Sequence, residues 1–284
     1  PYSGKMGGWA VLKVIACITT EHDVRFVLLA AAICLFSCLT AYTIAGQCRT
    51  ITPLRRGRWV CLLAFVSGTG IWATHFIAML AYQPHLPTSY DPILTFLSIL
   101  LAIVVTGMAW KGILKDEAKG SLKRGLQFSS GILAMHFTGM AAVQTFGRIE
   151  YELGMVLIAA AVGAVFSVAA MRAFTGRFSH IPLVPSAYTV ASICSIHFGS
   201  MAAVSIYPVP GYKVPESAMD PATLTLIVAA VVVTIMIAGL TTLTLELRAA
   251  SRAREETDRL KRFTESALEG LVILQGDHIV DAND

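Results

Sequence analysis

Long apolar segments alternate with short polar connections along most of the chain. A transmembrane helix needs about 20 residues to cross the hydrocarbon core of a bilayer. Seven segments approach or exceed that length, at residues 24–46, 60–82, 92–112, 125–146, 153–174, 184–206 and 221–245. The pattern predicts an all-α integral membrane fold with seven transmembrane helices. Residues 1–22 precede them and predict either an interfacial helix or a frayed terminus.

The basic residues are distributed unevenly among the connections. Lys and Arg gather in every second one, at residues 47–59, 113–124 and 175–183. The alternate connections hold at most one each: none in 83–91, Arg148 in 147–152 and Lys213 in 207–220. Connections rich in Lys and Arg stay in the cytoplasm. The N-terminus is therefore expected outside and the C-terminus in the cytoplasm of a multi-pass membrane protein.

A histidine motif recurs inside three of the apolar segments. His75, His136 and His197 are 61 residues apart, and each is followed by Phe at the next position and by Met four residues later. A period of two helices predicts three parallel two-helix repeats plus a closing helix, together residues 23–245. The three histidine helices then run in the same direction. Their imidazoles should lie at one depth, in the outer half of the membrane.

These residue types point to a metal site. Imidazole suits copper, zinc, iron and nickel, and a thioether selects soft ions such as Cu(I). Positions four residues apart share one face of a helix. The expected ligands are three His–Met pairs, with Met135 and Cys194 as further candidates: His75, Met79, His136, Met140, His197 and Met201. Zinc and a haem are alternatives to copper, and purely structural histidines and methionines are the other interpretation.

Four acidic residues open outer helix ends: Asp23, Asp91, Glu152 and Asp220. A carboxylate near a helix N-terminus is stabilised by the helix dipole, which is a sufficient structural reason for each. The functional alternative is that they orient the imidazoles from the second coordination shell or guide cations inward. Both interpretations remain open on the sequence alone.

Composition supports the membrane assignment and weakens an enzymatic one. Apolar residues make up 55% of the 284 residues and charged residues 14%, and the mean hydropathy is +0.67. The net charge is a modest +4, and no nucleic-acid partner is expected. The six cysteines show no paired framework. The chain has no nucleophile–base pair and no phosphate-binding glycine loop, so we expect no catalysis within it.

The C-terminal part changes character. Residues 246–265 are rich in Arg and Glu with a weak 3.5-residue apolar period, which predicts either a linker helix that forms a homodimer or a solvated helix. Residues 266–284 then read as strand, tight turn and strand. A hairpin this short is unstable alone. We expect the truncated start of a soluble domain here.

The histidine motif resembles the MHYT domain of bacterial sensor proteins. The middle unit, Met135-His136-Phe137-Thr138, is nearest to the family signature, with Phe in place of Tyr. The resemblance implies a copper site of these His and Met residues that senses oxygen, nitric oxide or carbon monoxide. The C-terminal segment looks like the opening of a PAS domain. Similar proteins often continue into domains that make or degrade cyclic di-GMP. A metal transporter or channel with the same ligands is the alternative function.

Overall fold

The computed structural model describes residues 3–50, 53–83, 86–116, 120–178, 180–209, 215, 217–265, 272–275 and 278–282. The chain divides into two units, Pro1–Gly239 and Leu240–Asp284. The first unit is a helix bundle with short strands in its loops.

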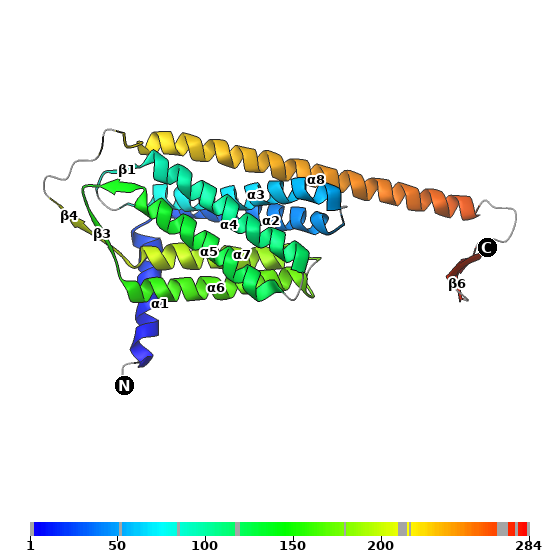
Figure 1. The fold of residues 1–284 in the computed structure, drawn as a ribbon, viewed down its shortest axis with the longest axis horizontal. Coiled ribbons are helices and arrows are strands. Elements are labelled where there is room, and N and C mark those ends of the chain that lie inside the picture. Colours follow the sequence, from blue (N-terminus) through cyan, green and yellow to red (C-terminus); the bar gives the residue numbers. More distant parts are fainter. Residues whose placement is uncertain are drawn as a thin grey trace. The chain divides into compact units, whose positions relative to one another are not determined.

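Eight helices follow one another in the described residues (Figure 1). They are α1 (Ser3–Thr20), α2 (Val24–Thr50), α3 (Pro53–Ala81), α4 (Pro92–Asp116), α5 (Ser121–Ala141), α6 (Leu153–Thr175), α7 (Leu183–Met201) and α8 (Pro221–Glu265). The helix predicted over 221–245 and the linker helix predicted over 246–265 are one continuous element. No Gly or Pro occurs between Leu240 and Glu265, so nothing in the sequence favours a break.

Five helices within the described residues are long and apolar enough to cross a membrane. They include Val24–Arg49, Arg56–Ala81, Pro92–Lys115, Leu153–Thr175 and Pro221–Arg262. Helices α5 and α7 are less apolar because they carry Ser, Thr and His, and several of these polar side chains are buried against other helices. The expectation that these two also span the membrane stays a prediction.

Four short strands lie in the loops at one end of the bundle, here called the strand end (Figure 1). Strand β1 (Thr88–Tyr90) pairs antiparallel with β2 (Val143–Thr145), and β3 (Gly147–Tyr151) pairs with β4 (Val204–Pro208). The prediction that the fourth and sixth apolar helices reach residues 146 and 206 was wrong. These helices end at Ala141 and Met201 because the chain leaves them to form β2 and β4.

The same hydrogen bond closes each of three helix pairs. The amides of Asp23, Asp91 and Glu152, just before α2, α4 and α6, donate to the carbonyls of Ala81, Ala142 and Ala203 over 2.9, 2.7 and 2.9 Å. Each alanine follows its histidine by six residues, or about 9 Å of helix. These bonds fix the end of each histidine helix against its partner, so the three histidines lie at the same distance from the strand end.

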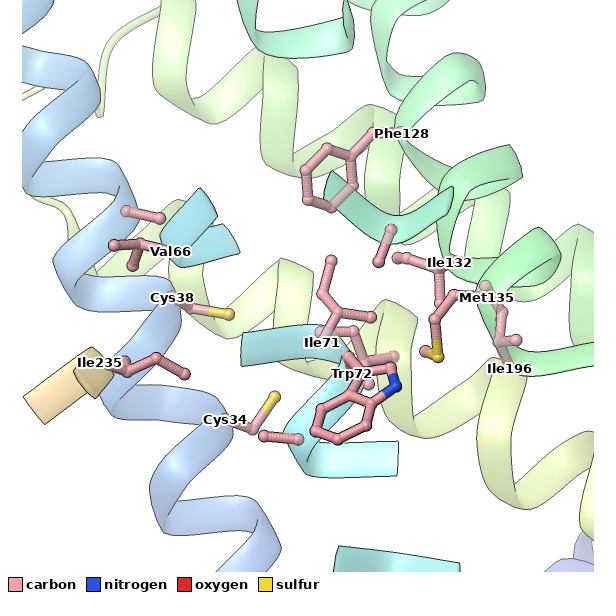
Figure 2. Packing of buried hydrophobic residues seen from close by; sticks show 14 of the residues in the cluster. Cys34, Cys38, Val66, Ile71, Trp72, Phe128, Ile132, Met135, Ile196 and Ile235 are labelled. Carbon is pink, nitrogen blue, oxygen red and sulfur yellow. The ribbon is translucent and has the colours of Figure 1, made fainter. Parts of the chain in front are cut away.

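The apolar core fills the space between the helices. Figure 2 shows Trp72, Ile132, Met135 and Ile196 among its buried side chains. Helix α8 joins this core through one face, which includes Leu224, Val228 and Ile235. It lies close to α2 at Gly239, where an added Cβ would meet the Phe36 ring at 2.5 Å. The N-terminal half of α8 is therefore packed on the bundle.

The second unit contains the end of α8 and a hairpin. Strand β5 (Val272–Gln275) pairs antiparallel with β6 (His278–Ala282), with a register shift between Ile273 and Leu274. The predicted strand–turn–strand pattern is confirmed for these residues, and its turn at 276–277 lies outside the described residues. Its assignment to a PAS domain stays a prediction.

Candidate metal centre

Three histidines converge from α3, α5 and α7. His75, His136 and His197 are 2%, 1% and 5% exposed, although imidazole is polar. Their ring centroids are 5.0, 5.3 and 5.4 Å apart, and the rings are nearly perpendicular to one another. One nitrogen of each ring lies within 4.8 Å of the other two. Within the described residues this is the only group of three or more His, Cys, Asp or Glu side chains placed to share a metal ion.

The nitrogen separations fit a common ion. The Nδ1 atom of His75 is 3.2 Å from Nδ1 of His197 and 3.3 Å from Nδ1 of His136. Imidazole nitrogens lie about 2.0–2.1 Å from zinc, so two of them on one trigonal or tetrahedral ion are about 3.3–3.6 Å apart. The observed distances are close to that range. Two of the three Nδ1 separations therefore fit those expected around one ion, and one nitrogen of each ring lies within 4.8 Å of the other two.

Hydrogen bonds among the three imidazole rings do not satisfy all of their nitrogen atoms. A neutral imidazole has one N–H donor and one acceptor nitrogen. Nδ1 of His75 faces two other Nδ1 atoms, and the Nε2 atoms of all three rings are buried with no hydrogen-bond partner. Buried polar groups without partners are costly. A cation bound by the three Nδ1 atoms would use their converging lone pairs at once. The Nε2 atoms have no partner in either case.

Small residues let the histidine helices approach one another. A Cβ added to Gly139 would lie 2.5 Å from Nε2 of His75, which is too close for any side chain. The corresponding positions, three residues after the other histidines, are Ala78 and Ser200. The sequence signal that could have marked this position is a small residue at +3 in every unit.

The phenylalanines after His75 and His136 pack on aromatic neighbours. Phe76 lies 5.9 Å from the Tyr90 ring and 4.9 Å from Trp72, and Phe137 lies 5.8 Å from Tyr151. Both phenylalanines thus contact the tyrosines at the ends of β1 and β3. Since the histidines are almost inaccessible to water, an ion there would be held in an environment of low polarity.

The predicted sulfur ligands are all in or near the core. Met79, Met140 and Met201 are 1–3% exposed and follow their histidines by one helical turn. Met135 is packed in the apolar cluster (Figure 2). Cys194 is half-buried. Helix geometry places each +4 methionine on the stripe that carries its histidine. The burial of these side chains is equally consistent with a purely packing role. That their thioether and thiol sulfurs bind a metal therefore stays a prediction.

The four acidic residues make local contacts in the structure. The Oδ1 atoms of Asp23, Asp91 and Asp220 accept backbone amides at the starts of α2, α4 and α8, and Glu152 pairs with Lys13 at 3.0 Å. Three of the four are therefore helix caps. A role in orienting the imidazoles or guiding ions stays a prediction.

His22, just before α2, is a buried residue near the cluster that was not among the site residues predicted from the sequence. It is 4% exposed, and its ring lies 5.5 Å from Phe198 and 6.2 Å from His197. Burial lowers its pKa from the usual 6.5, although the Cys17 carbonyl opposes the shift. A neutral ring donates from Nδ1 to that carbonyl at 2.8 Å, which leaves the buried Nε2 without a partner beside the histidine cluster. No local pattern marks this long-range approach.

Three curated bacterial proteins are similar in sequence to this chain. An uncharacterized signaling protein of Caulobacter vibrioides is 33% identical over 276 residues, which are 96% of this chain and 34% of the relative. In Pseudomonas aeruginosa, the cyclic di-GMP phosphodiesterase NbdA is 30% identical over 181 residues, covering 60% of this chain and 23% of its own length. The bifunctional diguanylate cyclase/cyclic di-GMP phosphodiesterase MucR of that species is 35% identical over 183 residues, 58% of this chain and 26% of MucR. The matched part of this chain thus spans about a third of the length of the first relative and about a quarter of the other two. No solved structure matches it.

A family model matches two of the three helices that carry the histidines. The model describes MHYT, the bacterial signalling protein N-terminal repeat, and it matches residues 68–119 and 130–184. The first match includes His75 and the second includes His136, whereas His197 lies beyond the second match. Together with the five long apolar helices, this indicates a multi-pass bacterial membrane protein. The chain therefore contains the MHYT repeat domain of bacterial signalling proteins.

Proposed function

We propose that this chain is the sensory part of a receptor in the bacterial inner membrane. His75, His136 and His197 hold a metal ion, copper in this proposal, near the outer face. A diatomic gas (oxygen, nitric oxide or carbon monoxide) or a redox change alters the ion's coordination. The change passes through the helices to a cytoplasmic output domain.

One observation carries this proposal: three buried imidazoles with Nδ1 atoms 3.2 and 3.3 Å apart. The donor set fits copper because imidazole accepts both of its oxidation states and a thioether selects Cu(I). Bound copper would supply one-electron redox chemistry and an open position for a diatomic ligand. The chain's own residues fix the three nitrogens and exclude water through the phenylalanines at +1.

Helix α8 offers a route from the site to the output. It is the described helix that runs from the bundle into the second unit. Its packed face contacts α2, and α2 contacts both α3 and α7, which carry two of the histidines. A ligand acts on such a system by binding one helix arrangement more tightly than another.

The packing beneath the histidines favours a receptor over a transporter. Transport needs a polar path that continues to the other end of the bundle. Two pairs of buried hydroxyls there bond to each other, Ser167 with Ser192 at 2.8 Å and Tyr42 with Thr189 at 2.8 Å, while the buried Ser129 hydroxyl has no partner. The cavity beside Tyr42 measures about 10 Å³. That is no more than the space for one water molecule.

Two relatives suggest the output. NbdA and MucR are cyclic di-GMP enzymes, and each is matched over about a quarter of its length. We propose that the protein containing this chain regulates cyclic di-GMP turnover, with a homodimer formed through the C-terminal half of α8. The catalytic step belongs to that output domain and not to the membrane bundle.

Metal analysis of protein purified without an affinity-metal step tests the site. We expect one copper per chain, and less than about a tenth of that in His136→Ala, because losing one of three ligands of a buried site removes most of the affinity. His180→Ala is the matched control. His180 is an exposed histidine at the opposite end of the bundle, and its loss should leave the copper content unchanged.

The optical spectrum of the same samples identifies the bound group. A Soret band would identify the bound group as a haem and not as copper. Absence of any transition metal, or equal metal in wild type and His136→Ala, would refute the histidine site. Copper flux into liposomes at a rate that falls with His136→Ala would favour transport instead.

A further inference from the structure

A second pocket lies at the end of the bundle opposite the strand end. It is formed by the N-terminal parts of α5 and α7 and the C-terminal part of α6, and its volume is about 630 Å³. Ligand sites commonly have volumes of about 300–1,000 Å³. Its lining is mainly apolar, with Leu122, Leu126, Val165 and Val168 among its residues. These helices belong to the membrane bundle, so this wall is suited to an acyl chain.

Polar groups gather at the rim of the same pocket. Arg172 and Arg177 both line it, together with Phe178 and Tyr188. Both arginines are exposed, and no acidic side chain forms an ion pair with either within the described residues. The Tyr188 ring stacks on Phe166 at 6.5 Å, which holds the hydroxyl-bearing ring in place. Two guanidinium groups beside one hydroxyl form a set of donors for an anion.

Two helix ends add to the positive potential. Helices α5 and α7 begin at this end, at Ser121 and Leu183, and α5 has no side-chain cap on its first amides. In α7 the Val184 amide donates to the Ile181 carbonyl at 3.2 Å and Pro185 has no N–H, so α5 contributes most of the free amides. Free amides at a helix N-terminus favour a negative group. The guanidinium fork also matches two oxygens of a phosphate.

We propose that this pocket binds an anionic phospholipid of the inner leaflet, with its phosphate on Arg172 and Arg177 and one acyl chain along α5 and α6. The apolar walls continue from the arginines into the membrane region. This selects a lipid over a water-soluble phosphate, because a small anion would leave the walls uncovered. The inference uses the orientation predicted from the loop charges and does not depend on a metal at the histidines.

Native mass spectrometry of the purified full chain tests the proposal. The protein is mixed with equal amounts of phosphatidylglycerol and phosphatidylcholine that carry the same acyl chains. We expect wild type to retain phosphatidylglycerol over phosphatidylcholine by about fivefold or more, because only the former has a net charge for the guanidinium groups. The double variant Arg172→Gln/Arg177→Gln should bring this ratio close to one.

Two further variants make the result specific. Arg58→Gln removes one positive charge from the same end of the bundle, but Arg58 does not line the pocket, so the preference should remain. Arg172→Lys/Arg177→Lys keeps both charges and should keep about half of the preference or more. Size-exclusion profiles and helical circular dichroism establish that each variant is folded.

Three outcomes would overturn the proposal. One is an unchanged lipid preference in the folded double Gln variant. Another is an equal loss in Arg58→Gln, which would mean that general surface charge attracts the lipid. The third is complete displacement by excess inorganic phosphate, which would assign the pocket to a soluble anion.

Discussion

At the scale of single residues, the site depends on how closely side chains approach. Each histidine motif supplies one imidazole, but a shared ion requires nitrogens a little over 3 Å apart. Gly139 makes this approach feasible, because His75 Nε2 occupies the space that a Cβ would need. The +1 phenylalanines then cover the cluster. The chemistry of the site is thus set by small residues as much as by ligands.

Gly139→Ala should weaken metal binding at the histidine cluster. The new methyl group would lie 2.5 Å from His75 Nε2, so the ring must shift out of its position beside the other two. We expect a loss of affinity of about tenfold or more, comparable with the disruption of a ligand's supporting contacts. A metal titration of purified protein measures it.

Gly154→Ala is the matched control for that substitution. Gly154 is also in a helix, and an added Cβ there would meet nothing within 4 Å. Alanine should leave metal affinity unchanged and stabilise the fold by up to about 1 kcal/mol. If the two alanine variants bound metal equally well, the close approach at Gly139 would not matter for the site.

At the scale of elements, polar groups at the helix ends set the depth of the histidines. Asp23, Asp91 and Glu152 each donate a backbone amide to the end of the adjacent histidine helix. The carboxylates of the two aspartates also cap their own helices. The acidic positions that the sequence marked thus have a structural role, whether or not they also act on ions.

Asp220 gives this capping role a pH dependence. Hydrogen bonds from the Thr223 side chain and amide lower the pKa of Asp220 below its usual 3.8. The folded chain then binds this proton less tightly than the unfolded chain. Its stabilisation of the start of α8 is fully present above about pH 3.8 and is lost as the pH falls through the lower, folded pKa.

Amide hydrogen exchange at residues 222–225 measures this effect, because Pro221 has no amide hydrogen. After correction for intrinsic rates, protection in wild type should fall as the pH drops below about 3.8. Asp220→Asn can accept the same hydrogen bonds without titrating, so its protection should stay level. An identical decline in both proteins would show that another group controls the start of α8.

At the scale of the whole molecule, the loop charges predict the orientation in the membrane. The strand end should face outward and the C-terminal half of α8 should lie in the cytoplasm. Both proposed sites depend on this orientation in different ways. The metal centre would then be near the outer face, where an external gas arrives, and the lipid pocket would be in the inner leaflet.

Cysteine labelling in intact cells tests the orientation. Ser205 is exposed on β4, and Ser251 is exposed on α8. A membrane-impermeant maleimide should modify Ser205→Cys in intact cells and Ser251→Cys only after lysis. The unsubstituted chain gives the background, which should be low because four of its six cysteines are buried, Cys194 is half-buried and the exposed Cys61 lies in an apolar span. The reverse labelling pattern would invert the proposed topology.

The sequence by itself determined the helices, their order and the residue types of the site. Apolar runs and the period of 61 residues are local or repeated patterns, so they can be read without coordinates. The helix ends at 141 and 201 could not be predicted in this way, because they depend on β1–β2 and β3–β4 pairs between segments more than 50 residues apart.

Only the tertiary structure decided how close the chemical groups lie. The motif placed His75, His136 and His197 at one depth, but the 3.2 and 3.3 Å separations of their nitrogens result from helix packing around Gly139. The approach of His22 to His197 and the gathering of Arg172, Arg177 and Tyr188 around one pocket have the same origin. Such contacts join different helices, and a one-dimensional pattern does not specify the rotation and spacing of one helix against another.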